Sequence, residues 1–78
     1  MKKIQILGMG CAKCRQLTEN AETAARELGI EFEIEKVTDL DRMARMGVIM
    51  TPALAIDGEV KAAGKVLAPE EIKKHLSP

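Results

Sequence analysis

Two stretches of the chain alternate between apolar and polar residues. Residues 2–7 (KKIQIL) are rich in isoleucine and stop at Gly8, and residues 30–37 (IEFEIEKV) place a glutamate at every second position from 31 to 35. Successive side chains of a strand point to opposite faces, so this period of two predicts a strand in each stretch. Because the glutamates need water, we expect residues 30–37 to form a strand with one solvated side at a sheet edge.

A first helix is predicted to begin near Cys11, and its apolar residues recur with a helical period from Cys14 to residue 28. Apolar residues that recur three or four positions apart lie on one face of a helix and predict that this face is buried. Gly29 can end the helix, because glycine readily takes the left-handed conformation that follows a last helical turn. The predicted buried face comprises Cys14, Leu17, Ala21, Ala24 and Leu28.

A second, shorter helix is predicted between two polar residues and a glycine. Thr38 or Asp39 can cap its first turn, because both side chains can accept a hydrogen bond from an unpaired backbone N–H group. Gly47 can end it. The residues predicted to face inward are Leu40, Met43 and Ala44.

The remaining residues predict a hairpin followed by a helix. Residues 48–56 (VIMTPALAI) are apolar and predict a strand, and Asp57-Gly58 is a strong signal for a turn into a second strand over residues 59–63 (EVKAA). Residues 68–76 (APEEIKKHL) predict a final helix. Proline suits a first helical turn, and the acidic start and basic end of this segment match the helix dipole.

The predicted order of elements is β-α-β-α-β-β-α, which is an α/β fold. The first two strands are joined through a helix and should be parallel, with a right-handed connection. The two strands of the hairpin should be antiparallel. The sequence therefore predicts one small domain over residues 1–78, with a four-stranded mixed sheet covered by three helices.

Composition narrows the possible functions. Twelve lysines and arginines balance twelve aspartates and glutamates, and the chain has one Phe, no Trp and no Tyr. The chain therefore has neither the excess of basic residues nor the aromatic stacking platform that would support nucleic-acid binding. No apolar run approaches the ~20 residues of a membrane helix, and no signal-peptide cleavage site follows the basic N-terminus. We therefore expect a cytoplasmic protein with no nucleic-acid or membrane partner.

Residues 8–14 (GMGCAKC) hold the only two cysteines of the chain. In a reducing compartment a C-x-x-C pair is more often catalytic or metal-binding than structural. Cys11 is expected at the start of the first helix, where unpaired N–H groups and the helix dipole stabilise a thiolate. Lys13 either adds a positive charge that favours this thiolate or is simply a solvated lysine. Cys14, one turn later on the apolar face, should be more buried. This asymmetry suits exchange, in which one thiolate attacks and the neighbouring thiol resolves the mixed disulfide.

With these features the chain resembles the thioredoxin fold, and most closely the small thioredoxin- or glutaredoxin-like redox-active disulfide proteins of archaea and bacteria. The pieces that carry the resemblance are CAKC at residues 11–14 together with MTPALAIDG at residues 50–58. The resemblance covers nearly the whole chain and implies a minimal thioredoxin fold. It also implies that Cys11 is the nucleophile and Cys14 the resolving cysteine.

The Thr51-Pro52 pair is the second part of the resemblance. By similarity to the family, Pro52 is a cis-proline that faces the cysteines, and proline is the residue for which a cis bond costs least. A cis bond would let the Thr51 backbone pair with an extended substrate. Hydrophobic periodicity alone is equally consistent with a trans proline at a strand entrance.

The residues next to the cysteines differ from those of thioredoxin itself, which has Trp before its first cysteine and Gly-Pro between the two. Here Gly10 precedes the first cysteine, and Ala12 and Lys13 lie between the pair. We expect these three residues to tune the reactivity of the dithiol. Thioredoxin's buried acid has no evident counterpart, because the acids at residues 31–35 are expected to face solvent.

The activity that the resemblance implies is thiol-disulfide exchange. The chain would cycle between a Cys11–Cys14 disulfide and a dithiol, and would reduce protein disulfides without a bound cofactor or metal. Its expected partners are a disulfide-containing protein substrate and an unidentified reductase, and we expect a monomer.

Other uses of the same motif are less well supported. M-x-C-x-x-C at residues 9–14 resembles copper chaperones and heavy-metal-associated domains, and two thiolates suit Cu(I) or Zn(II), so this alternative stays open. Those domains end in a strand, however, whereas this chain predicts a final helix. A phosphate loop is disfavoured because Lys13 stands where the third glycine of G-x-G-x-x-G belongs. A purely structural disulfide would close too short a loop to stabilise the fold much.

Overall fold

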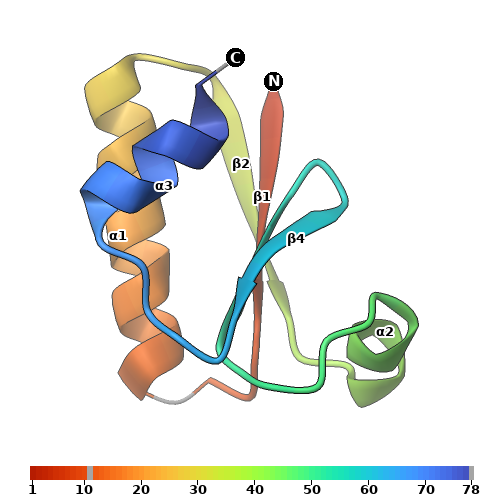
Figure 1. Ribbon diagram of the computed structural model, residues 1–78. Coiled ribbons are helices and arrows are strands. Elements are labelled where there is room, and N and C mark those ends of the chain that lie inside the picture. The colour runs from red at the N-terminus through yellow and green to blue at the C-terminus, as the bar shows by residue number, and fades with distance from the viewer. Residues whose placement is uncertain (11, 78) are drawn as a thin grey trace.

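The computed structural model describes residues 1–10 and 12–77. In this part of the chain the order of elements is β-α-β-α-β-β-α, as the sequence predicts, and the architecture is that of a small thioredoxin fold (Figure 1). The elements are β1 (Lys2–Leu7), α1 (Ala12–Leu28), β2 (Phe32–Val37), α2 (Leu40–Arg45), β3 (Ala53–Ile56), β4 (Glu59–Ala63) and α3 (Pro69–Leu76).

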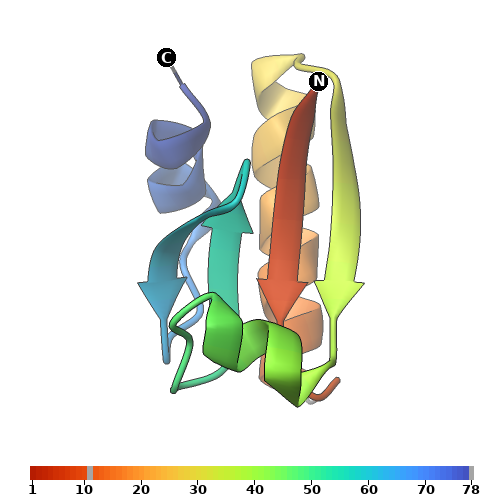
Figure 2. The same ribbon diagram turned by 90° about the vertical axis from the view of Figure 1, so that its right-hand side faces the viewer.

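The four strands form one mixed sheet in the order β2-β1-β3-β4 (Figure 2). β1 pairs with β2 in parallel, with Ile4 opposite Ile34. β3 is antiparallel to both β1 and β4. The predicted parallel first pair, the predicted antiparallel hairpin and the predicted edge position of β2 are all confirmed.

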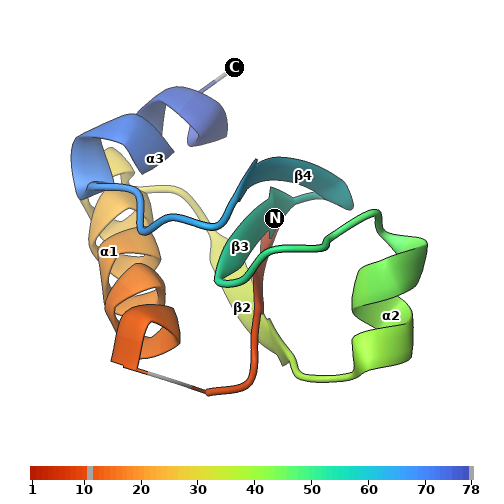
Figure 3. The same cartoon turned by 60° about the horizontal axis from the view of Figure 1, so that its bottom comes forward.

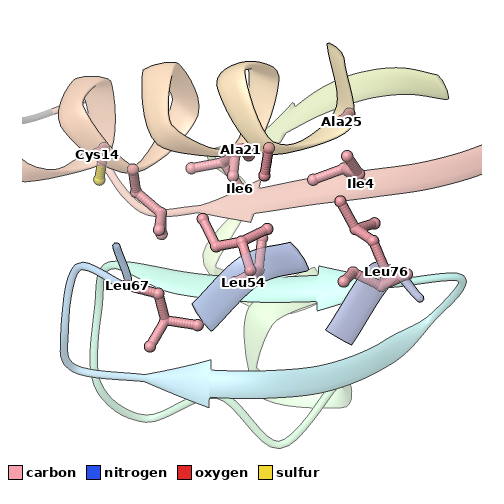
Figure 4. Packing of buried hydrophobic residues seen from close by; sticks show 12 residues of the cluster. Ile4, Ile6, Cys14, Ala21, Ala25, Leu54, Leu67 and Leu76 are labelled. Carbon is pink, nitrogen blue, oxygen red and sulfur yellow. The ribbon is translucent and has the colours of Figure 1, made fainter. Parts of the chain in front are cut away.

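The helices form two layers around the sheet. α1 and α3 lie on one face, and α2 lies on the other (Figure 3). The larger core cluster lies under α1 and α3, where Cys14, Ala21 and Ala25 are directed towards Ile4 and Ile6 of β1 (Figure 4). A smaller cluster lies on the α2 side of the sheet and contains Leu7, Val37, Met43, Val48, Ala53 and Ala55.

The hairpin turn has the geometry that its sequence demands. Asp57 has φ 51° and Gly58 has φ 85°, so both central residues are in the left-handed region of a type I′ turn. Asp57 also fixes the turn to β1, because its carboxylate accepts a hydrogen bond from the Lys3 N–H at 3.0 Å.

Several sequence-based boundaries and burial predictions are wrong. β2 begins at Phe32 and not at residue 30, and β3 begins at Ala53 and not at residue 48. Residues 48–52 form a loop because Pro52 has no N–H group to donate to a strand ladder.

Three residues predicted to be buried are exposed instead. α2 has only six residues and buries Met43 alone, which leaves Leu40 66% exposed and Ala44 exposed. Leu28 is the last residue of α1 and is 36% exposed, because the buried face of that helix ends at Ala25. No helix within residues 1–10 and 12–77 combines the length and the apolar character needed to cross a membrane.

Candidate functional site

Cys14 lies in the first turn of α1, on the face that packs against the sheet. It is 5% exposed, which confirms the prediction that it is buried together with Leu17 and Ala21. The hydroxyl group of Thr18, one turn later, donates a hydrogen bond to the Cys14 carbonyl oxygen at 2.9 Å. Cys11, the predicted nucleophile, lies outside the described residues; in the sequence it directly precedes Ala12, where α1 begins.

Gly8 directly follows β1 and lies against the Cys14 sulfur. A Cβ atom at this position would overlap the sulfur, and it would also lie 3.7 Å from the Cβ atom of Thr51. The absence of a side chain at Gly8 therefore leaves room for both Cys14 and Thr51 beside this glycine. The sequence suggested only that Gly8 ends a strand, and no local pattern could reveal which distant side chains meet it.

The Thr51-Pro52 peptide bond is cis, as the resemblance implies. Pro52 is buried, and its carbonyl oxygen accepts a hydrogen bond from the Gly64 N–H at 2.8 Å, just beyond the end of β4. Thr51 itself is exposed beside Gly8. The structure thus brings Thr51 close to Cys14, while the substrate-binding role of the Thr51-Pro52 pair stays a prediction.

Three exposed apolar side chains lie next to these residues. Met9 is 64% exposed and follows Gly8, whereas Ile49 and Met50 are 93% and 59% exposed and precede Thr51. We call Met9, Ile49 and Met50 the apolar patch. Met50 packs over Gly64, because a Cβ atom at that glycine would lie only 3.0 Å from the Met50 terminal methyl carbon.

A small cavity of about 40 Å³ borders Cys14, and it is large enough for a water molecule. The sequence did not single out Lys36 as a member of its lining. The alternation of β2 could have identified Lys36, because Phe32 and Ile34 pack on the α1 side of the sheet and Lys36 is the next residue of the strand on that face. The lining residues are Ile6, Gly8, Gly10, Cys14, Arg15, Thr18, Lys36 and Thr38.

The three predicted tuning residues lie next to this cavity or at the start of α1. Gly10 lines the cavity, is exposed and has φ 79°. Ala12 and Lys13 are the first two residues of α1, and both are exposed. Their influence on the dithiol stays a prediction.

Glu35 differs from the solvated acid that the strand pattern predicted. Its carboxylate accepts two hydrogen bonds from Arg42, at 2.9 and 3.1 Å, and one from Gln5 at 2.9 Å. The hydrogen bonds from Arg42 and Gln5 lower the pKa of Glu35 from 4.5 to about 2. This carboxylate fastens α2 to the sheet and so fixes the start of the loop that leads to Thr51.

Within residues 1–10 and 12–77, no three side chains of the types His, Cys, Asp and Glu gather in a position to hold a metal ion. Cys11, on which the metal-binding alternative depends, is not among those residues.

Comparison with known proteins gives a consistent result. A family model described as "Thioredoxin domain" matches residues 2–77. A protein of Methanothermobacter thermautotrophicus named thioredoxin is 51% identical over 77 residues, which cover 99% of this chain and 100% of that protein. A protein of Methanocaldococcus jannaschii, also named thioredoxin, is 46% identical over 76 residues, which cover 97% of this chain and 87% of that protein. The similarity therefore includes all of the strands and helices described above.

Proposed function

The chain belongs to the thioredoxin domain family, and from that premise we propose that it reduces protein disulfides through a dithiol formed by Cys11 and Cys14. Relatives of similar length named thioredoxin support a thiol-disulfide oxidoreductase kind of function. The observation that carries the proposal is the position of the Cys14 sulfur, which is buried against Gly8 close to the exposed Thr51.

The proposed reaction has two exchange steps. The Cys11 thiolate attacks one sulfur of the substrate disulfide, so that a Cys11–substrate disulfide forms and the other substrate sulfur leaves as a thiolate. Cys14 then attacks the Cys11 sulfur, which forms the Cys11–Cys14 disulfide and releases the second substrate thiolate. Two electrons pass from the protein to the substrate. The proton of Cys14 and one proton from solvent, which replaces the one that Cys11 lost on ionisation, end on the two substrate thiols.

The burial of Cys14 gives the two cysteines different roles in this scheme. A thiol that is 5% exposed cannot readily reach a disulfide on another protein, whereas it can attack a sulfur three residues away in its own chain. The Thr51 backbone, beside Gly8, would hold the substrate as an added extended segment. Thr51 and Pro52 are therefore proposed to bind substrate, and Gly10, Ala12 and Lys13 to tune the dithiol.

The proposed cycle also defines the partners and the compartment. After each turnover a separate reductase must supply two electrons to the Cys11–Cys14 disulfide. A dithiol that works by reduction fits a reducing compartment, and we propose the cytoplasm, with the chain acting as a monomer and without a bound cofactor.

A trapping experiment tests the cysteine roles. Each single cysteine variant is incubated with insulin, and mixed disulfides are identified by non-reducing electrophoresis and mass spectrometry. We expect Cys14→Ser to accumulate a Cys11–insulin adduct, because nothing in that variant can resolve it, and Cys11→Ser to accumulate none. The unmodified chain should accelerate insulin reduction by dithiothreitol. Adducts on Cys14 alone would reverse the roles, and adducts on neither cysteine without any acceleration would refute the proposed function.

A further inference from the structure

Building on the proposed function, we propose that this chain docks preferentially on disulfides flanked by acidic residues and adjacent to an apolar side chain. The occupant of the site would be an acidic, extended segment of a protein substrate. The apolar patch would receive the apolar side chain, and four cations around it would attract the acids. These cations are Lys13, Arg15, Lys36 and Lys65.

The apolar patch has the position required for docking. Figures 1 and 3 show that the segment before α1 and the loop after α2 lie at the same end of the sheet. Met9 comes from the first segment, and Ile49 and Met50 come from the second. Met50 packs over the backbone of Gly64 while remaining 59% exposed.

The four cations lie beside Cys14 or next to residues that contact the apolar patch. Arg15 and Lys36 line the cavity beside Cys14, and Lys13 directly precedes that cysteine in the first turn of α1. Lys65 follows Gly64, on which Met50 packs. Lys13, Lys36 and Lys65 are all exposed, so their ammonium groups can reach a partner without losing buried contacts.

None of these four cations forms an ion pair within the described residues, whereas six other cations do. The paired ones are Lys2, Lys3, Arg26, Arg42, Lys61 and Lys73. The acid nearest in sequence to Lys36 is Glu35, whose carboxylate pairs with Lys3 and Arg42. Asp39, three residues after Lys36, caps α2 by accepting a hydrogen bond from the Asp41 N–H.

The chain as a whole is neutral, but these four cations have no ion-pair partner among the described residues that would offset their charge. Exposed charges contribute little to stability, but an excess of one sign around a site steers an oppositely charged partner towards it. Charge complementarity thus selects an acidic segment, and the apolar patch selects an apolar residue within it.

Two matched peptides test the inference. Each is closed by one disulfide and contains the same apolar residues, but glutamates flank the cysteines in one peptide and lysines in the other. For each peptide, the rate at which the reduced chain reduces the disulfide is divided by the rate at which dithiothreitol reduces the same disulfide. This ratio removes the intrinsic effect of the flanking charges, because the attacking group is a thiolate in both reactions.

We expect the normalised rate for the acidic peptide to exceed that for the basic peptide by about fivefold or more at low salt. The difference should largely disappear in about 0.5 M salt, where charges more than a few ångströms apart are screened. The double substitution Lys36→Gln and Lys65→Gln should reduce the preference. Lys74→Gln, which removes an exposed and unpaired lysine of α3 far from the site, should leave it unchanged.

Each result decides a different claim. Equal normalised rates, a faster basic peptide, or an acidic preference that persists in the double variant or at high salt would overturn the inference and leave the proposed function intact. Failure to reduce either peptide would refute the proposed function and the inference with it.

Discussion

At the scale of single residues, Gly8 is the position on which the geometry around Cys14 most depends. Any Cβ atom there would overlap the Cys14 sulfur, and both residues belong to the buried part of the molecule. We expect Gly8→Ala to lower the free energy of unfolding by about 1–3 kcal/mol, as other overpacked cores do, because the sulfur or the backbone must shift. Urea unfolding of both proteins measures the change.

The same substitution in a Cys14→Ala background provides the control. Removing the sulfur removes the atom that the new methyl group would meet, so the cost of Gly8→Ala should fall by more than half. An equal cost in the two backgrounds would mean that a contact other than the one with Cys14 restricts position 8.

At the scale of elements, the attachment of α2 depends on Glu35 of β2 and Arg42 of α2. The pKa of Glu35 is lowered to about 2, so its contribution to stability is fully present above the ordinary value of 4.5 and is lost as pH falls through about 2. In the unmodified chain the midpoint temperature of unfolding should therefore fall as pH decreases from 4.5 to about 2. We expect this fall to be smaller in Glu35→Gln, which has no carboxylate to protonate at this position. Thermal unfolding as a function of pH measures the decline.

The neighbouring acid Glu33 serves as the matched control. It is exposed on the same strand and has no hydrogen bond or ion pair among the described residues, so Glu33→Gln should leave the pH profile unchanged. Identical profiles for Glu35→Gln and the unmodified chain would show that the Arg42 pair does not stabilise the native state.

The elements also show how far the sequence predicts this fold. β1, α1 and the Asp57-Gly58 hairpin depend on local periods and turn chemistry, and the sequence predicts them correctly. The inward placement of Leu40 fails because a six-residue helix covers too little of the sheet to bury a whole face. The partners of Glu35 were missed because they come from two other elements, and a strand period contains no information about them.

The candidate site was likewise predicted only in part. The sequence alone predicts a buried Cys14, and the family resemblance supplies the cis bond before Pro52; both are confirmed. The meeting of Cys14, Gly8 and Thr51 depends on how β1 and β3 pair, which no short stretch of sequence encodes.

At the scale of the whole molecule, the candidate site lies at one end of the core, and Cys14 belongs to both. The larger core cluster extends along the sheet beneath α1 and α3, while Cys14, the cis bond and the apolar patch gather at one end of the sheet. At this end, the exposed cations Arg15 and Lys36 border the cavity beside the buried Cys14 sulfur. We propose that this end carries a reversible dithiol.

A redox titration of the metal-free protein tests that claim most directly. The chain is equilibrated in a series of thiol/disulfide buffers, the thiols are trapped, and the dithiol fraction is counted by mass spectrometry. We expect one two-electron transition between the dithiol and the Cys11–Cys14 disulfide, with a midpoint within or close to the range of about −270 to −200 mV found for thioredoxins and glutaredoxins. The absence of any intramolecular disulfide across the accessible potentials, together with Cu(I) binding that survives competition by glutathione, would contradict the account and favour metal carriage.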